Sequence, residues 1–203
     1  MSFSDDLADL ARRLRPRGAK ARAVMVCPVA SGSGASTVAS GLANLYARLS
    51  ARPVWLFDLD FAGNGQAARS PLRAERFDAG ADGFWRCEPA GAGRLVVRQR
   101  ARGPIFVSVF EHRPDTVTGL RLRSAPAYWS RVREACGLVL VDAPAFSPAI
   151  APVASDMDGV ILVADARTTS RDAADALQAR IEESGSRVLG IVVNRAGAQR
   201  SAA

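Results

Sequence analysis

The apolar residues of this chain fall into short continuous runs that are separated by more polar stretches. Runs of this kind predict buried β-strands. They occupy residues 23–27, 53–59, 105–110, 137–142, 159–165 and 187–194.

Between these runs lie segments whose apolar residues recur at helical spacing, which predicts amphipathic helices. Residues 1–14 carry the stripe Leu7, Leu10, Ala11 and Leu14. Residues 36–49 carry the stripe Val38, Leu42, Leu45 and Leu49. We expect two further helices at about 126–135 and 169–184.

The continuous apolar character of the strands favours a parallel sheet that is covered by helices on both faces. Strands and helices alternate along most of the chain, which is typical of an α/β doubly wound fold. Residues 63–102 are the least legible part, because they are rich in glycine and charge and show no clear period.

Length and composition indicate one domain. The chain has 203 residues and is 48% hydrophobic, which suffices for one sizeable core. We expect residues 1–20 to form an N-terminal amphipathic helix and residues 21–203 to form a single domain. No apolar run reaches the roughly 18 residues that span a bilayer.

The cysteines and the N-terminus indicate a cytoplasmic location. Three widely spaced cysteines without a CxxC pair fit a reducing compartment and predict no metal site. The first residues include Asp5, Asp6 and Asp9, which do not form a secretory signal.

The net charge is +7, and almost all basic residues are arginines, since Lys20 is the only lysine. A basic balance is compatible with nucleic acid or an anionic membrane surface. The plainer interpretation is an arginine-rich composition spread over a solvated surface. Because the arginines are scattered, we do not expect a nucleic-acid partner.

The segment "PVASGSGASTVASGLA", residues 28–43, has the outline of a phosphate-binding loop between a strand and a helix. Gly32 and Gly34 allow close backbone approach to an anion, and a hydroxyl at Ser36 or Thr37 can ligate Mg²⁺. An ordinary serine-capped turn is the alternative.

Carboxylates follow two of the expected strands. Asp58 and Asp60 end the run "WLFDLD", and Asp142 ends "GLVLVD". The carboxyl ends of parallel strands face the crevice where ligands bind in this architecture. The alternative for each residue is a turn or a helix cap.

Five segments together resemble a known family: "SGSGASTVASGLA", "VWLFDLD", "GLVLVDAPA", "DGVILVADARTT" and "VLGIVVNR". Their order and spacing are similar to those of the MinD/ParA-type P-loop ATPases. They are most similar to the cytoplasmic domain of bacterial tyrosine kinases of capsule and exopolysaccharide synthesis. The resemblance spans about residues 21–195.

The resemblance implies a set of site residues. The nucleotide would contact Gly32, Ser33, Gly34, Ala35, Ser36, Thr37 and, near the adenine, Asn194. Mg²⁺ would be held by Ser36, Asp58, Asp60 and Asp142.

The sequence departs from the family at the residues that carry charge. Ala35 replaces the phosphate-binding lysine, and Ala30 stands where the MinD/ParA branch has its signature lysine. A lost charge-assisted hydrogen bond of roughly 1.5–3 kcal/mol weakens binding about 10- to 150-fold. We therefore expect weak ATP or ADP binding with Mg²⁺, or none, and a catalytically silent protein.

Tyrosine phosphorylation is also not expected. The kinases end in a tyrosine cluster, whereas this chain ends "AQRSAA" and contains only Tyr46 and Tyr128. Both tyrosines lie in predicted helices beside apolar residues, so we interpret them as packing residues.

The resemblance implies a regulatory or scaffolding subunit of bacterial exopolysaccharide synthesis and export. Its partner would be an inner-membrane polysaccharide co-polymerase or a similar membrane protein. It would self-associate, as a dimer, and lie in the cytoplasm, peripherally at the inner membrane.

Two alternatives remain open. One is a weakly active ATPase or kinase with a rescuing arginine. The other is a MinD/ParA-type positioning or pilus-assembly protein, against which we note that no amphipathic helix follows Asn194. The stripe of residues 1–14 either packs on the protein itself or docks on another subunit.

Overall fold

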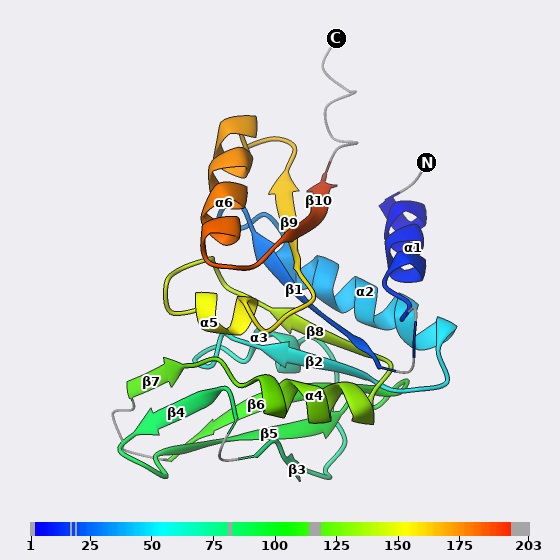
Figure 1. The fold of residues 1–203 in the computed structure, drawn as a ribbon. Coiled ribbons are helices and arrows are strands. Elements are labelled where there is room, and N and C mark those ends of the chain that lie inside the picture. The colour runs from blue at the N-terminus through cyan, green and yellow to red at the C-terminus, as the bar shows by residue number, and fades with distance from the viewer. Residues whose placement is uncertain (1–2, 17, 19, 81–82, 114–118, 196–203) are drawn as a thin grey trace.

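The computed structural model describes residues 3–16, 18, 20–80, 83–113 and 119–195. Within these residues an eight-stranded sheet has the order β10-β9-β1-β8-β2-β6-β5-β3 (Figure 1), and β4 pairs with β7 in a small second sheet. The strands are β1 (Arg22–Pro28), β2 (Val54–Asp58), β3 (Phe77–Asp78), β4 (Trp85–Glu88), β5 (Gly93–Gln99), β6 (Ile105–His112), β7 (Gly119–Leu122), β8 (Leu138–Asp142), β9 (Val160–Asp165) and β10 (Val188–Asn194).

Helices alternate with the strands along much of the chain. They are α1 (Phe3–Arg13), α2 (Ala35–Leu49), α3 (Gly65–Ala68), α4 (Pro126–Ala135), α5 (Ala151–Ala154) and α6 (Arg171–Glu183). No described helix is both long and apolar enough to cross a bilayer.

The doubly wound, mostly parallel sheet expected from the sequence is confirmed. The six strands from β10 to β6 run parallel to their neighbours. The strands β5 and β3 continue the sheet antiparallel. Residues 63–102, whose sequence shows no clear period, form β3 and β5 together with α3 and β4.

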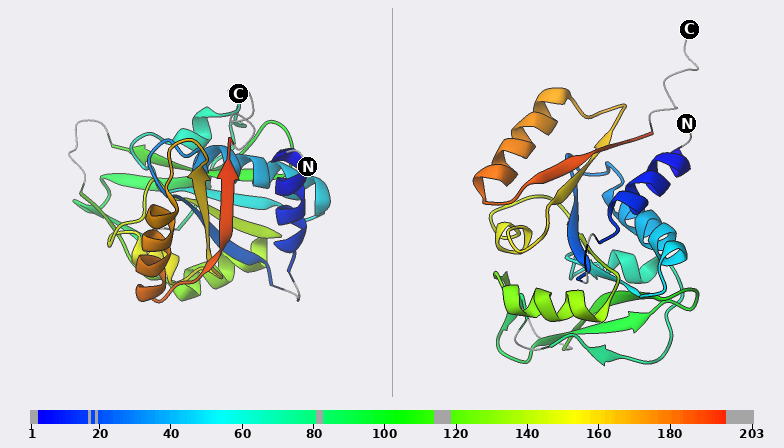
Figure 2. Two further views of the ribbon diagram at one scale, coloured as in Figure 1. Left: turned by 90° about the horizontal axis from the view of Figure 1, so that it is seen from above. Right: turned by 45° about the vertical axis from the view of Figure 1, so that its right-hand side comes forward.

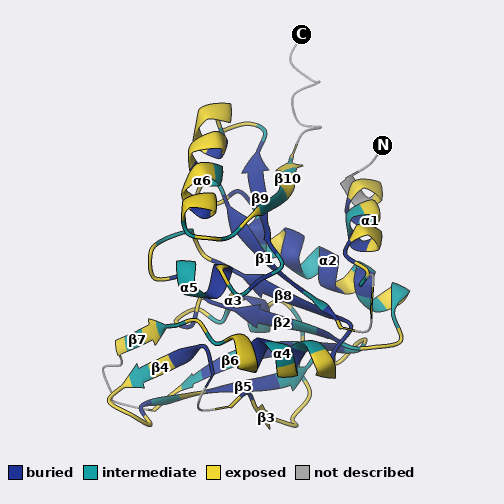
Figure 3. Ribbon diagram, viewed as in Figure 1, coloured by how far each residue is buried: buried dark blue, intermediate teal, exposed yellow. Residues whose placement is uncertain are grey.

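The two faces of the sheet bury separate apolar clusters. Along β1, Ala23, Met25 and Cys27 face one cluster, and Val24 and Val26 face the other. Such alternation follows from the two-residue period of a strand. Helices α1 and α2 cover the second face, and α4, α5 and α6 pack on the first (Figure 2). The central strands are consequently buried on both sides (Figure 3).

Helix α1 packs on the protein itself. Leu7 and Leu14 are 6% and 2% exposed and belong to the cluster under α2. A side chain at Gly41 of α2 would contact Leu7, so the two helices lie close together. Two of the three leucines of the stripe are thus covered within the chain, whereas Leu10 is half-buried, so the structure favours the interpretation that the stripe packs on the protein itself.

Strand β10 is an edge strand and is less buried than its apolar sequence indicates. Ile191 and Val193 are 42% and 50% exposed, and β10 pairs on one side only, with β9. Two expectations concern the C-terminal segment 196–203, which is expected to carry neither a tyrosine cluster nor an amphipathic helix. This segment lies outside the described residues.

Candidate functional site

The loop between β1 and α2 is a tight turn that depends on its glycines. Gly32 and Gly34 have φ angles of 79° and 89°, in the left-handed region that glycine adopts without a Cβ penalty. Ser33 is buried, and its Oγ donates to the carbonyl of Ala30 at 2.6 Å. The same Oγ accepts from the N–H of Ala30 at 3.2 Å, so the Ser33 side chain helps to fix the shape of the loop.

The loop ends at the first turn of α2. Gly34 is the N-cap, and no described side chain donates or accepts a hydrogen bond that caps the start of α2. Ala35 is the first helical residue and is buried, followed by half-buried Ser36 and exposed Thr37. The first amides of a helix lack intrahelical acceptors and carry partial positive charge. This end of α2 is thus suited to an anion.

Two carboxylates meet beside this helix end. Asp58 closes β2 and Asp142 closes β8, and the two residues are direct partners in the strand register. They are 4% and 3% exposed. The expectation that acidic residues gather where parallel strands end is confirmed for this pair.

Gln66 links the two carboxylates. Its backbone N–H donates to Oδ2 of Asp58 at 2.7 Å, and its side-chain Nε2 donates to Oδ2 of Asp142 at 2.7 Å. The same Nε2 donates to the carbonyl of Ser36 at 2.8 Å. Gln66 is fully buried, so α3 is held against both strand ends and the start of α2.

Burial changes the protonation of this pair. It raises the pKa of Asp58 to about 6, although the backbone N–H groups of Gln66 and Asp60 act in the opposite direction. Burial also raises the pKa of Asp142, against the hydrogen bond from Gln66 and the nearby Ser36 hydroxyl. Oδ1 of Asp142 is buried with no hydrogen-bond partner among the described residues. That oxygen is available to a cation.

Asp60 does not join the buried pair. It is exposed, and its Oδ1 accepts from the N–H of Gly63 at 3.0 Å. It therefore shapes the turn that leads to α3. Its charge still reaches the pair, since it contributes to the raised pKa of both Asp58 and Asp142.

The end of β10 closes over the loop from the other side. Nδ2 of Asn194 donates to the carbonyl of Ser33 at 3.0 Å. Arg195 donates to the carbonyl of Gly32 at 3.1 Å and to Oδ2 of Asp165 at 2.5 Å. The predicted adenine-side residue Asn194 is thus a direct contact of the loop backbone.

Asp165 anchors this closure. It ends β9 and accepts two hydrogen bonds from the Arg167 side chain, at 3.0 and 2.8 Å. The bonds from Arg167, and then that from Arg195, hold the pKa of Asp165 well below its usual range. Arg195 is the last residue of the motif "VLGIVVNR", but nothing in the sequence signals its contact with the loop.

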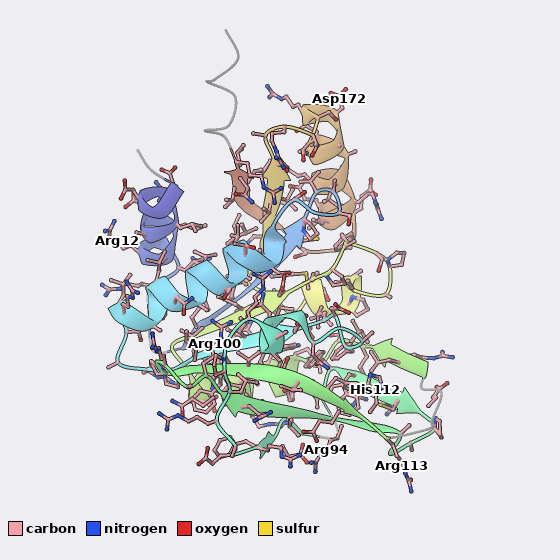
Figure 4. The ribbon with its side chains drawn as sticks, turned by 180° about the vertical axis from the view of Figure 1, so that it is seen from behind. Arg12, Arg94, Arg100, His112, Arg113 and Asp172 are labelled. Carbon is pink, nitrogen blue, oxygen red and sulfur yellow. The ribbon has the colours of Figure 1, made fainter. Side chains whose placement is uncertain are left out.

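Arg100 is a second residue that the sequence does not reveal. It is 3% exposed, and its Nη2 donates to Ser40 Oγ at 3.1 Å and to Oε1 of Gln66 at 3.3 Å. Figure 4 shows it beneath α2. Burial lowers its pKa, followed by the charge of Arg69. Its hydrogen bond to Oε1 helps to fix the orientation of the Gln66 side chain.

The residues fit a magnesium ion held mainly by its ligand. Mg²⁺ commonly uses one or two carboxylates, a hydroxyl and substrate phosphates, and it retains waters. Ser36 and the free Oδ1 of Asp142 provide such a donor set. Within the described ranges no group of three or more His, Cys, Asp or Glu residues has the arrangement of an all-protein metal site.

A separate hollow of about 790 Å³ lies at the ends of β4, β5 and β6. Its lining mixes charges: Glu111 pairs there with Arg94 at 2.9 Å and with Arg76 at 3.0 Å. Arg94, His112 and Arg113 mark its position in Figure 4. Because acidic and basic side chains both line it, it does not indicate one ligand chemistry.

Two comparisons of the sequence find nothing: neither a family model nor a curated protein matches the chain. Solved structures do match its fold. The kinase domain of the Escherichia coli tyrosine kinase ETK gives a TM-score of 0.63 at 17% identity, covering 89% of this chain and 71% of that one.

Two further structures extend the likeness. The BceF tyrosine kinase domain gives a TM-score of 0.62 at 16% identity, covering 94% and 76% of the two chains. The septum site-determining protein MinD from Pyrococcus horikoshii, complexed with Mg-ADP, gives 0.59 at 15% identity, covering 88% and 72%. The chain therefore has the fold of bacterial tyrosine kinase domains and MinD ATPases, as the sequence resemblance implied.

Proposed function

We propose that this chain is a catalytically silent, tyrosine-kinase-like P-loop protein. In this proposal it acts as a regulatory or scaffolding subunit in bacterial exopolysaccharide synthesis and export. One observation carries the proposal: Ala35 is the first residue of α2, where the resemblance places the phosphate-binding lysine. Its buried methyl group offers no charge to a phosphate.

The chain's one lysine does not compensate. Nζ of Lys20 lies 3.4 Å from Ser130 Oγ and 3.8 Å from the Glu134 carboxylate, both on α4. Lys20 precedes β1, whereas the loop follows it. Seven strand residues separate the two ends of β1 by roughly 20 Å.

We further propose that the site holds ATP or ADP weakly, with Mg²⁺. Ser36 and Asp142 would hold the ion, and the α2 amides would receive phosphate oxygens. When bound, Mg²⁺ would neutralise part of the phosphate charge. Loss of one electrostatic donor typically costs on the order of 10²–10³ in rate, so binding without turnover is the expected outcome. The likeness to MinD with Mg-ADP supports this proposal.

The partner in this proposal is an inner-membrane polysaccharide co-polymerase or a similar membrane protein. The chain would self-associate as a dimer and stay in the cytoplasm, peripheral to the inner membrane. The likeness to the ETK and BceF kinase domains supports this choice. Buried Tyr46 and Tyr128 support a role without autophosphorylation, since they are only 2% and 6% exposed.

The test is co-purification with the cytoplasmic segment of an inner-membrane polysaccharide co-polymerase from the same organism. We expect the wild-type protein and a Ser36→Ala, Asp142→Ala variant to bind it alike, without phosphotyrosine on either protein after incubation with Mg-ATP. Phosphotyrosine that depends on Ser36 and Asp142 would refute the silent-subunit proposal.

A MinD/ParA-type positioning role is the second candidate, because MinD shares the fold. It requires nucleotide-dependent dimerisation or surface association. Sedimentation with anionic vesicles in ATP and in ADP separates the two candidates, since a scaffold bound to a protein partner should ignore the nucleotide in this assay.

A further inference from the structure

An arginine from outside the loop reaches the N-terminus of α2. Arg69 directly follows α3, and its Nη1 donates to Thr37 Oγ1 at 3.3 Å. Its charge also acts on two buried residues, because it partly opposes the rise in the pKa of Asp142 and contributes to the lowered pKa of Arg100. The Arg69 guanidinium thus interacts with three residues near the start of α2: Thr37, Asp142 and Arg100.

The backbone that carries Arg69 is fixed. Asn64 begins α3 in the left-handed region, with φ of 45°, and its N–H donates to the carbonyl of Asp60 at 2.8 Å. Gln66 then ties the helix to Asp58 and Asp142. Arg69 therefore starts from a rigid position one turn beyond Gln66.

The other two arginines near the loop are already engaged. Arg195 is bound to the Asp165 carboxylate and to the carbonyl of Gly32. Arg100 is buried and donates to Ser40 and Gln66. Arg69 is exposed, and it has no ion-pair partner within the described ranges. Of the three, it has the most donors left for a ligand.

A second observation points to a ligand at the same place. Oδ1 of Asp142 is buried without a partner among the described residues, beside Ser36. A carboxylate oxygen left in that state is costly unless a cation or donor reaches it. Arg69 and the free oxygen of Asp142 lie on either side of the start of α2. The guanidinium suits the negative phosphates of a magnesium-bound polyphosphate, and the carboxylate oxygen suits its magnesium ion.

We propose that Arg69 is the cationic phosphate-binding residue of this site and that it contacts the terminal phosphate of a magnesium-bound nucleoside diphosphate. The guanidinium comes from the segment after β2 and takes the place of a lysine in the loop. A planar guanidinium can bind a phosphate through two parallel hydrogen bonds. This inference rests on the proposed nucleotide binding and assigns its missing positive charge.

The geometry also separates binding from catalysis. Arg69 lies on the exposed rim of the site, where water screens its charge. It supplies a contact to bound phosphate without the buried charge that stabilises a transferring group. Binding through Arg69 is therefore compatible with a catalytically silent protein.

The test compares the affinity of the full chain for fluorescent ADP in Mg²⁺ among Arg69→Ala, Arg69→Lys and Arg73→Ala. Arg73 is a matched control because it is an exposed arginine on the same segment. We expect roughly tenfold weaker binding for Arg69→Ala, partial recovery for Arg69→Lys and wild-type affinity for Arg73→Ala. All four proteins should melt within about a degree of one another.

Two further measurements, a salt titration and a competition with inorganic pyrophosphate, complete the test. Binding by the wild type should weaken more steeply with salt than binding by Arg69→Ala, and inorganic pyrophosphate should compete. Equal affinities of Arg69→Ala and wild type, or no binding by the wild type, would overturn the role of Arg69 and leave a silent subunit intact. Efficient hydrolysis by the wild type would overturn the silent subunit and leave the Arg69 contact standing.

Discussion

The side-chain Nε2 of Gln66 lies 2.7 Å from Oδ2 of Asp142 and occupies one oxygen of the carboxylate that the sequence assigns to Mg²⁺. The other oxygen of Asp142 is buried and free of hydrogen bonds from the described residues. One oxygen of Asp142 thus holds α3 in place through Gln66, and the other can accept a cation.

Replacing Gln66 by leucine should destabilise the protein. The change keeps the size of the side chain but removes the hydrogen bonds to Asp142, the Ser36 carbonyl and Arg100. Buried groups left without partners cost about 1–3 kcal/mol each. Urea denaturation should show a loss in this range or above it.

The control for this substitution is Gln99→Leu, because the one hydrogen bond of the Gln99 side chain within the described residues goes to the exposed Gly103 carbonyl. It should change the free energy of unfolding by less than about 0.5 kcal/mol. Equal effects at the two glutamines would contradict the bridging role of Gln66.

Asp58 should make stability depend on pH in buffer without Mg²⁺. Its pKa of about 6 in the folded protein lies above the ordinary value of 3.8, so the folded state keeps this proton longer than the unfolded state. The contribution of Asp58 to the free energy of unfolding should fall as pH rises from about 4 to about 6 and then stay level. The change is about 3 kcal/mol.

The difference between wild type and Asp58→Asn isolates this group from the other titrating residues. Chemical denaturation at several pH values between 4 and 8 provides the measurement. The prediction fails if the free energy of unfolding of the wild type, relative to Asp58→Asn, stays constant or rises with pH across this window. Burial would then not disfavour the ionised form of Asp58.

The N-terminal stripe should contribute to stability through Leu7 of α1 and Leu14, which directly follows the helix. Leu7→Ala and Leu14→Ala should each cost about 2–5 kcal/mol, because both side chains are buried under α2. Leu10 is only half-buried, so Leu10→Ala is the matched control and should cost less than about 1 kcal/mol. Thermal melts and sedimentation velocity give stability and association state together. Loss of association without loss of stability would revive the docking interpretation of this stripe.

The two loop glycines should respond differently to alanine. Both have positive φ, which costs an alanine roughly 1–2 kcal/mol. A Cβ at Gly32 meets no atom within 4 Å, whereas one at Gly34 collides with Nδ2 of Asn194. Gly34→Ala should therefore be the more destabilising change.

The excess cost at Gly34 should disappear in a double variant. When Asn194 is already alanine, Gly34→Ala should cost about as much as Gly32→Ala, because the collision is gone. A cycle of denaturation measurements gives this coupling. Zero coupling between positions 34 and 194 would mean that β10 does not close over the loop.

The central strands could be predicted from the sequence because they are apolar without interruption. Runs such as 137–142 and 159–165 can only be accommodated where helices cover both faces of a sheet. β10 is the exception, since its apolar sequence occupies an edge and leaves Val193 half exposed. Edge position depends on strand order, which periodicity does not contain.

The antiparallel end of the sheet could not be predicted. β3 has only two residues, both exposed, so it shows no burial period. α3 has four residues, too few to produce a helical stripe. These elements exist because tertiary neighbours support them.

The sequence could predict the positions of the candidate residues that lie on strand ends and on the loop. Asp58 and Asp142 follow legible strands, so parallel register alone brings them together. Gln66, Arg69 and Arg100 come from the illegible segment and reach the site only through the fold. The missing lysine was visible in the sequence, but the arginine beside the helix was not.

The measurement that tests the central claim most directly is Mg²⁺-dependent phosphate release from ATP by the wild-type chain. Its control is the Ser36→Ala, Asp142→Ala variant, which lacks the proposed magnesium contacts, and an Ala35→Lys variant shows whether the loop can use a lysine. We predict that wild type and control release phosphate at the same negligible rate, while Ala35→Lys binds nucleotide more tightly. Wild-type turnover clearly above the control would contradict the account of a catalytically silent protein.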